Sequence, residues 1–445
     1  MASTYLTRTF GTATNRKKFT LSMWVKQSGR GSGNNNSLLV SGASGQNEGT
    51  IKISSDAILW SEYNVGSSSS VATLTSNQLL RDYSAWYNLV FAWDSANATA
   101  DDRMKIYLNG EQVTSFSTRT NAPLNYDAQI NNSIEHNIGR QTWNSSGLFD
   151  GSMSHIHFCD GQSYDATAFG EYDDNGVWTI KTSPSVTYGT NGFFILKNGN
   201  SVTDQSGNSN NFTVASGTLT NTEDNPSNVF ATWNALDKPG TAPMPGLSLG
   251  NTYWNKTGTG PGNNSQASST LAVSSGKWYY EIKINDSNSV IIGIDQASGT
   301  YNVDGNSLQF NGISYENTGN KVYNGSGQGT YGASYTTNDI IGIAFDLDNN
   351  YIYFSKNGTW QNSSVPTSGA TGTGGIAITS TNVFYKMAIC NYNYNATSNH
   401  YANFGNGYFG TTAVASAGTN ASGIGIFEYD VPTGFTALST KGLNL

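Results

Sequence analysis

The chain has 445 residues and a formal net charge of −8, and charged residues make up 12% of it, against roughly 25% in an average soluble protein. No basic stripe is present for nucleic acid to bind, and no segment approaches the roughly 20 apolar residues of a membrane span. The N-terminus lacks the charged start and apolar run of a secretory signal, so we expect a soluble protein made in the cytoplasm.

The composition favours β-structure. The 50 glycines and the many asparagines suit tight turns, whereas the abundant Tyr, Thr, Val and Ile are strand formers. No convincing amphipathic helix occurs, and the length suggests two domains of roughly 200 residues each. We therefore predict an all-β protein with two antiparallel, jelly-roll-like β-sandwich domains joined by a structured connector.

The first predicted domain covers residues 1–165. It contains short runs in which apolar residues favour one face, separated by Gly, Asn or Ser, which is the pattern of a sandwich. These runs include FTLSMWVK (19–26), YNLVFAWD (87–94), RMKIYLNG (103–110) and SHIHFCDG (154–161).

Apolar periodicity weakens between residues 166 and 236, where only isolated pieces such as GFFILKN and NFTV resemble strands. A structureless linker would not contain so many large aromatic residues. We predict that 166–236 is a structured connector.

The second predicted domain covers residues 237–445, with a tail from 411 that is rich in Ala, Gly and Thr. Its strand patterns include KWYYEIKI (277–284), SVIIGID (289–295), DIIGIAFD (339–346), YIYFSKNG (351–358) and VFYKMAICNYNY (383–394).

One local design occurs in both predicted domains. An apolar strand ends in Asp, a polar turn and a second strand follow, and the pattern closes with Asn109-Gly110 in the first domain and Asn357-Gly358 in the second. An Asn-Gly pair is typical of a primed two-residue hairpin turn, because both central residues need positive φ. The sequence predicts such a hairpin in each domain.

The stretch DLDNNYIYFSKNG places Asp346, Asp348 and Asn350 at the alternate spacing of a calcium-binding loop. An EF-hand also needs Gly at the sixth position and Glu at the twelfth, where this chain has Tyr351 and Asn357. We therefore interpret the stretch as the corner of a hairpin and predict no metal site.

Two other metal hypotheses have some basis. A looser calcium contact by Asp94, Asp102 or Asp346 remains an alternative to solvated turn residues. In HIHFC, His155, His157 and Cys159 lie on one strand face, as in a zinc-binding strand, but a fourth ligand is not evident. We interpret Cys159 as a thiol packed as a small apolar residue and the histidines as facing outward or into a polar layer, and we predict neither a metal nor a cofactor.

No catalytic residue is predicted. The glycine run 327–332 matches G-x-G-x-x-G but no helix pattern follows it to bind phosphate. A glycosidase needs two carboxylates about 5 to 9.5 Å apart, and the nearest cluster, Glu171, Asp173 and Asp174, lies in the connector. Glu281 stands alone in a strand and is expected to be an edge or cross-strand partner.

Aromatic residues in predicted loops are the remaining candidates for ligand binding. Flat rings beside Asn side chains suit stacking on sugar rings, with hydrogen bonds to hydroxyl groups. The alternative is that these rings cover sandwich edges or lie in a subunit interface. The candidates are Tyr253, Trp254, Trp360, Tyr392 and Tyr394.

Both domains resemble known families. FTLSMWVK, YNLVFAWD, KIYLNGEQV and LFDGSMSHIHFCDGQ resemble the laminin G-like, concanavalin-type sandwich. GKWYYEIKI, DIIGIAFDLDNNYIYFSKNG and VFYKMAI resemble the SPRY (B30.2-like) domain. The resemblance implies two β-sandwiches that together cover most of the chain.

The connector and tail resemble virion structural proteins of tailed bacteriophages. The resemblance rests on the order of FGEYDDNGVWTIK, DQSGNSNNFTV, DNPSNVFATWN and the late GIGIFEYDVPTGFTALSTKGLN. It implies a non-enzymatic, homo-oligomeric component of the virion: a tail fibre, receptor-binding or capsid-decorating protein. Its expected partners are other virion proteins and a host-surface glycan, without nucleic acid or membrane insertion. A free lectin-like protein and a polysaccharide-degrading enzyme are the alternatives.

Overall fold

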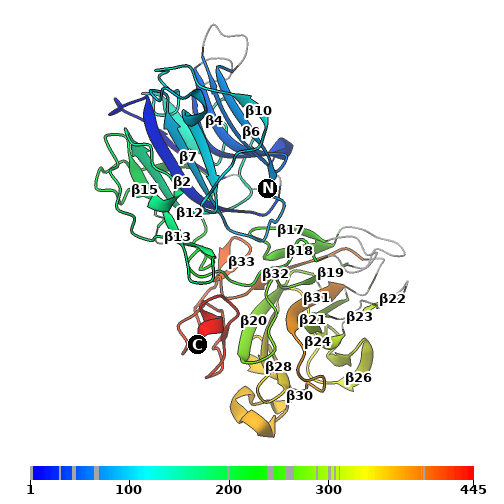
Figure 1. The fold of residues 1–445 in the computed structure, drawn as a ribbon. Helices are drawn as coiled ribbons and strands as arrows, with labels where there is room; N and C mark the ends of the chain where they lie inside the picture. Colours follow the sequence, from blue (N-terminus) through cyan, green and yellow to red (C-terminus); the bar gives the residue numbers. More distant parts are fainter. Residues whose placement is uncertain are drawn as a thin grey trace. The chain divides into compact units, whose positions relative to one another are not determined.

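The protein divides into two compact units, residues 1–221 and 222–445, each a β-sandwich (Figure 1). The computed structural model describes residues 4–29, 32–42, 47–64, 70–197, 201–237, 245–256, 265–286, 289–298, 302–304, 307–309, 311–391, 393 and 396–445. Within these ranges there is no α-helix, none of the helical turns is long and apolar enough to cross a membrane, and the predicted all-β sandwich fold is confirmed. The 3-10 turns are η1 (Ser32–Asn34), η2 (Ala100–Asp102), η3 (Ala166–Ala168), η4 (Gln361–Ser363), η5 (Pro366–Thr371) and η6 (Gly442–Asn444).

The first unit packs two sheets face to face. In the described part of this unit, the larger sheet has the order β10 (Phe116–Thr120), β6 (Ala72–Leu79), β5 (Ala57–Tyr63), β4 (Glu48–Ser54), β3 (Asn35–Gly42), β11 (Glu135–Ile138), β1 (Tyr5–Thr9) and β16 (Thr213–Ser216). The smaller sheet has the order β15 (Phe193–Ile195), β12 (Gly151–Asp160), β2 (Lys18–Gln27), β7 (Tyr87–Asp94), β8 (Met104–Leu108) and β9 (Glu111–Gln112). A separate hairpin joins β13 (Gly170–Tyr172) to β14 (Trp178–Ile180).

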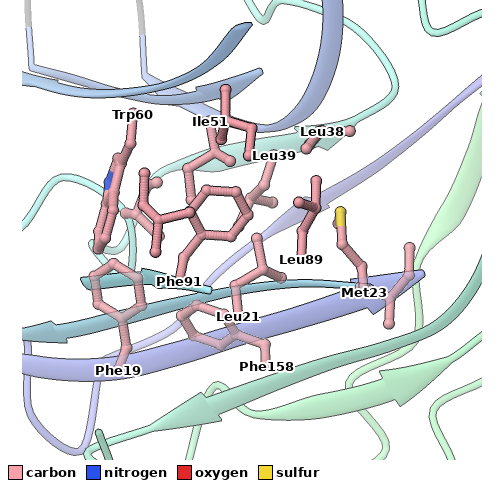
Figure 2. Close-up of a cluster of buried hydrophobic side chains, with 14 of the residues drawn as sticks. Phe19, Leu21, Met23, Leu38, Leu39, Ile51, Trp60, Leu89, Phe91 and Phe158 are labelled. Atoms are coloured by element: carbon pink, nitrogen blue, oxygen red, sulfur yellow. The ribbon is translucent and has the colours of Figure 1, made fainter. Parts of the chain in front are cut away.

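The core of the first unit lies between these two sheets. Alternate residues of a strand point to one face, so Phe19 and Leu21 of β2 and Phe91 of β7 face Ile51 and Trp60 of the larger sheet (Figure 2). All five side chains are buried. The inward-facing apolar side chains of these strands therefore hold the two sheets together.

The second unit repeats the architecture with different strands. In its described part, one sheet has the order β17 (Gly246–Ser248), β18 (Tyr253–Lys256), β32 (Ser398–Asn403), β20 (Lys277–Ile284), β27 (Ile340–Asp346), β28 (Tyr351–Lys356) and β29 (Thr359–Trp360), with β30 (Ile376–Ala377) on β28 and β35 (Thr436–Ala437) on β20. The other has the order β19 (Ser265–Ser268), β31 (Tyr385–Asn391), β21 (Val290–Gln296), β24 (Gly312–Glu316), β25 (Asn320–Tyr323) and β26 (Ser326–Thr330). Two small hairpins pair β22 (Asn302–Asp304) with β23 (Ser307–Gln309), and β33 (Tyr408–Phe409) with β34 (Thr412–Ala413).

The core of the second unit also lies between its two sheets. Tyr280 and Ile282 of β20 pack with Ile292 and Ile294 of β21 and with Phe354 of β28, and all of them are buried. The outer face of the larger sheet carries a separate apolar cluster around Tyr279. A further layer therefore covers this sheet on the side away from the core.

The predicted connector, residues 166–236, is shared between the two units. Its first part belongs to the first unit, where β15 pairs with β12 at the edge of the smaller sheet. Its last part belongs to the second unit, where Trp233 is buried and packs edge-on against Phe404 at 4.9 Å. The compact units are thus larger than the domains 1–165 and 237–445 expected from strand patterns alone.

Both Asn-Gly hairpins are confirmed. Asn109 and Gly110 have φ values of 48° and 88°, and Asn357 and Gly358 have φ values of 48° and 78°. The Asn side chains also act alike, since Asn109 Oδ1 accepts from the Asn88 amide and Asn357 Oδ1 accepts from the Ile340 amide, both at 2.8 Å.

An aromatic ring from a later segment packs on the glycine of each hairpin. A Cβ atom on Gly110 would lie 2.5 Å from Trp178 Cε3, and one on Gly358 would lie 2.7 Å from Tyr429 Cδ1. Both distances are too short for a carbon contact. Each turn therefore requires glycine for two reasons: the residue has a positive φ, and an aromatic ring occupies the space that a Cβ atom would need.

We predict that Gly358→Ala destabilises the second unit by roughly 1–2 kcal/mol more than Gly329→Ala does. Gly329 is the matched control because its φ is +81° and nothing lies within 4 Å of an added Cβ, so it carries the backbone strain without the ring. Urea unfolding of both full-length variants measures the difference. Equal losses would show that the Tyr429 ring moves away without cost.

Candidate functional site

The structure corrects the predicted position of two candidate aromatic residues. Tyr253 and Trp254 lie in strand β18 rather than in a loop. Trp254 is fully buried and stacks on His400 of the neighbouring strand β32, with ring centroids 5.7 Å apart. Its ring is part of the core and offers no surface for a ligand to stack on.

Tyr253 and Trp360 keep accessible surface. Tyr253 is half-buried, and its ring tilts against Tyr401 at 5.0 Å. Trp360 is half-buried at the end of β29 and packs against the outer cluster that contains Tyr353. Ligand binding by these two rings stays a prediction. Tyr392 and Tyr394 lie outside the described residues.

The acidic stretch after β27 is a hydrogen-bonded corner. Asp346 Oδ1 accepts from the amides of Asp348 at 3.1 Å and Asn349 at 2.9 Å. Its Oδ2 accepts from Asn349 Nδ2 at 2.8 Å and lies 3.0 Å from Lys277 Nζ. The protein's own donors therefore engage both oxygens.

Asp94 and Asp102 also have cationic partners, Lys18 and Lys105, each at 3.0 Å. Across the ranges that the structure describes, no group of three or more His, Cys, Asp or Glu side chains is placed to hold a metal ion.

The histidines of HIHFC are covered by the first part of the connector. His157 stacks on Phe194 at 3.8 Å, and its Nδ1 is 3.0 Å from the Tyr188 hydroxyl. His155 and Cys159 are buried as well, and burial lowers the pKa of His155 to about 4. Neutral, packed histidines explain this strand face.

The acidic cluster of the connector has local structural partners. Glu171 lies 3.5 Å from Lys181 Nζ. Asp173 Oδ1 accepts from the amides of Asn175 and Val177 and so closes the turn between β13 and β14.

A buried carboxylate holds the first part of the connector on its sandwich. Asp160, at the end of β12, accepts from the amides of Thr14 at 2.7 Å and Asn15 at 3.1 Å. It also accepts from Asn131 Nδ2 at 2.6 Å and from the amide of Asn191 in the connector at 3.0 Å. Because buried charges need such partners, this network joins four segments.

A second buried carboxylate holds the C-terminal tail, which in the structure we define as residues 404–445, a longer segment than the Ala-, Gly- and Thr-rich part from 411. Glu281 of β20 accepts from the amides of Glu428 and Tyr429, both at 2.9 Å. The Tyr279 hydroxyl and Asn403 Nδ2 also donate to it, both at 3.1 Å. Burial raises the pKa of Glu281 to about 7, although these hydrogen bonds favour the charged form.

The tail forms the outer layer of the second unit. Its strand β35 pairs in parallel with the start of β20, and the red C-terminal segment lies beside that strand in Figure 1. Phe427 and Phe435 of the tail are buried in the cluster around Tyr279.

A pocket of about 660 Å³ lies where the tail meets the sandwich. We call it the tail pocket, and its walls come from residues 272–278, 421–422 and 434–436, from Gly442, Leu443 and Leu445, and from Asp348 and Phe384. Sequence patterns did not predict it. Phe384 was interpreted as part of a strand, and the Ala-, Gly- and Thr-rich tail gave no signal of where it packs.

Comparisons with known families agree with these two folds. Residues 2–163 match the concanavalin A-like lectin/glucanases superfamily, and residues 277–385 match the SPRY domain. The predicted concanavalin-like N-terminal domain and SPRY-like C-terminal domain are confirmed.

Among curated proteins, 90 residues, 20% of this chain, are 33% identical to the ATP-dependent RNA helicase DDX1 of Xenopus laevis, and they span 12% of that protein. The SPRY domain of human HERC1 is similar at 16% identity, covering 34% of this chain and 87% of its own, with a TM-score of 0.27. A putative carbohydrate binding protein from Bacteroides ovatus ATCC 8483 is similar at 14% identity, covering 50% and 59%, with a TM-score of 0.31.

We predict that Glu281 makes the second unit more stable at pH 5 than at pH 8. Its pKa is about 7 in the folded chain and 4.5 without the protein environment, so between these values the folded state binds a proton that the unfolded state has released. The contribution of Glu281 to the free energy of unfolding is therefore fully present below about pH 4.5. It is lost as the pH rises through 7, and the total loss is about 3 kcal/mol.

The test compares wild type with Glu281→Gln by calorimetry of the full chain at several pH values. The effects of the other titrating groups cancel when the Tm of Glu281→Gln is subtracted from that of wild type. This difference in Tm should therefore become smaller from pH 5 to pH 8. An advantage that grows with pH would mean that the four donors hold the carboxylate charged.

Proposed function

We propose that this protein is a non-enzymatic structural component of a tailed-bacteriophage particle that binds glycan on the host surface. The glycan-binding part rests on one observation: residues 2–163 match a superfamily described as concanavalin A-like lectins and glucanases. These residues form the greater part of a rigid two-sheet sandwich. Loops on such a scaffold lose little conformational entropy when they bind a ligand, because the strands that carry them are already fixed.

The particle part rests on the motifs that resemble virion proteins. In DQSGNSNNFTV, Asp204 accepts from the amides of Phe194 at 2.8 Å and Asn210 at 2.9 Å. In GIGIFEYDVPTGFTALSTKGLN, the amides of Glu428 and Tyr429 bind Glu281. These motifs fasten the covering layers of both sandwiches, which suits a rigid protein exposed outside the cell. Many homo-oligomeric copies on one particle would bind the host surface together, so that each single contact could be weak while the avidity is high.

The non-enzymatic proposal draws support from the carboxylates. Glu171 and Asp173 have local partners in the connector hairpin, and Glu281 is buried under the tail. The other hypotheses are a free lectin-like protein and a polysaccharide-degrading enzyme, and each predicts a different binding or cleavage result.

We predict that the full chain binds a subset of surface polysaccharides on a glycan array, and more strongly when it is displayed in many copies than as a monomer. Strong binding by the isolated monomer would favour a free lectin. Release of reducing ends from the bound glycan, abolished by Glu171→Gln, would identify an enzyme. Absence of binding at any valency would contradict the glycan part.

We also predict that antibodies raised against the full chain label intact phage particles that contain it, at many sites per particle in electron micrographs. Antibodies against a protein that is present in the same lysate but absent from the particle serve as the control. Recovery of the chain only in the particle-free supernatant would contradict the particle part.

A further inference from the structure

We propose that the tail pocket is a binding site for one or two rings of a neutral saccharide. The inference rests on the proposed glycan-binding function and adds a site on the second unit, outside residues 2–163, whose superfamily match supports that function. The volume of about 660 Å³ is within the range of roughly 300–1,000 Å³ that is usual for small-ligand sites.

Exposed apolar side chains gather at this pocket. Phe384, Leu443 and Leu445 line it and are 57%, 47% and 78% exposed. Grouped apolar surface beside a concavity usually marks a binding site. Leu443 and Leu445 belong to the tail, so the same segment that closes the outer face of the sheet supplies most of the apolar rim.

Hydrogen bonds fix the backbone on which Phe384 stands. Its carbonyl accepts from the Ala297 amide at 2.7 Å, and the next residue, Tyr385, exchanges backbone hydrogen bonds with Val273 at 2.8 and 2.9 Å. The backbone below the ring is thus fixed on both sides while the ring stays in solvent. An exposed aromatic face suits the C–H face of a sugar ring, and the fixed backbone below it needs no ordering on binding.

Polar groups beside the ring suit hydroxyl groups. The exposed Asp348 carboxylate is oriented by the Gly276 amide, which donates to its Oδ1 at 2.7 Å. A carboxylate can accept several hydrogen bonds, so Asp348 keeps capacity for a ligand. Ser274 and Ser275 also line the pocket.

The charge of the pocket indicates a neutral ligand. Lys277 lines it, but its ammonium group is 3.0 Å from Asp346 Oδ2, a carboxylate that is itself buried. The cation is therefore compensated within the protein, and Asp348 adds a negative charge. An acidic sugar would gain no free cation from the residues that line this pocket and would meet that carboxylate.

At Trp278, strand β20 has no open edge to which a peptide could add as a β-strand. Such binding needs a strand with an open backbone edge. At the pocket, Trp278 of β20 is paired with Thr436 of β35 on one side and with Phe345 of β27 on the other. The indole N–H of Trp278 also donates a hydrogen bond to the Ser275 carbonyl at 2.8 Å.

The test is calorimetric titration of the full chain with maltose, lactose, mannobiose and diacetylchitobiose. We expect at least one of them to bind, and Phe384→Ala and Asp348→Asn each to weaken that binding by about tenfold or more. The amide oxygen that Asp348→Asn introduces can still accept from Gly276, so this variant keeps the local fold.

Leu236→Ala is the matched control, because Leu236 is 60% exposed in the same unit and does not line the pocket. The affinity of this variant should stay within about twofold of wild type.

Two results would overturn the inference, and they can be told apart because one leaves the proposed glycan binding intact and the other does not. If wild type binds a sugar and both pocket variants bind it as tightly, the site lies elsewhere while the proposed glycan binding stands. If wild type binds none of the four sugars and no glycan on the array, the proposed function falls together with the site.

Discussion

The second unit depends on one interaction, the acceptance of two tail amides by the buried carboxylate of Glu281. A carboxyl group at this depth is costly unless donors surround it, and the tail supplies half of the donors described above. Removing the tail would take away these donors and would uncover the apolar cluster around Tyr279. The tail is therefore an integral layer of the sandwich, and the tail pocket exists because that layer is fixed.

In the first unit, a buried carboxylate also holds a covering layer on the sandwich, but with different residues. Its outer strand face is covered by the first part of the connector, which Asp160 holds through the amide of Asn191. In each unit an Asn-Gly hairpin carries an aromatic ring of the covering layer, Trp178 in one case and Tyr429 in the other. A sandwich, a covering layer that follows it in the chain and a buried carboxylate that joins them form a shared design.

Local patterns were sufficient to predict the long core strands and the two Asn-Gly hairpin turns. Alternation in 19–26 and 339–346, and the positive φ that Asn357-Gly358 needs, are properties of neighbouring residues. The division of the connector, the burial of Trp254 and the tail pocket depend instead on contacts across long stretches of chain. Trp254 follows a Gly- and Asn-rich run that is typical of a loop, yet the strand that buries it comes after residue 397. No local signal carries that information.

The proposed saccharide site on the second sandwich is completed by the tail. Hydrogen–deuterium exchange of the full chain, with and without the disaccharide that binds best, tests this role of the tail most directly. We expect slower exchange on binding at residues 272–278, 383–385 and 434–436, with the amides of Glu428 and Tyr429 already protected in the free protein. Protection confined to the first unit, or a tail that exchanges as fast as an unfolded chain, would contradict it.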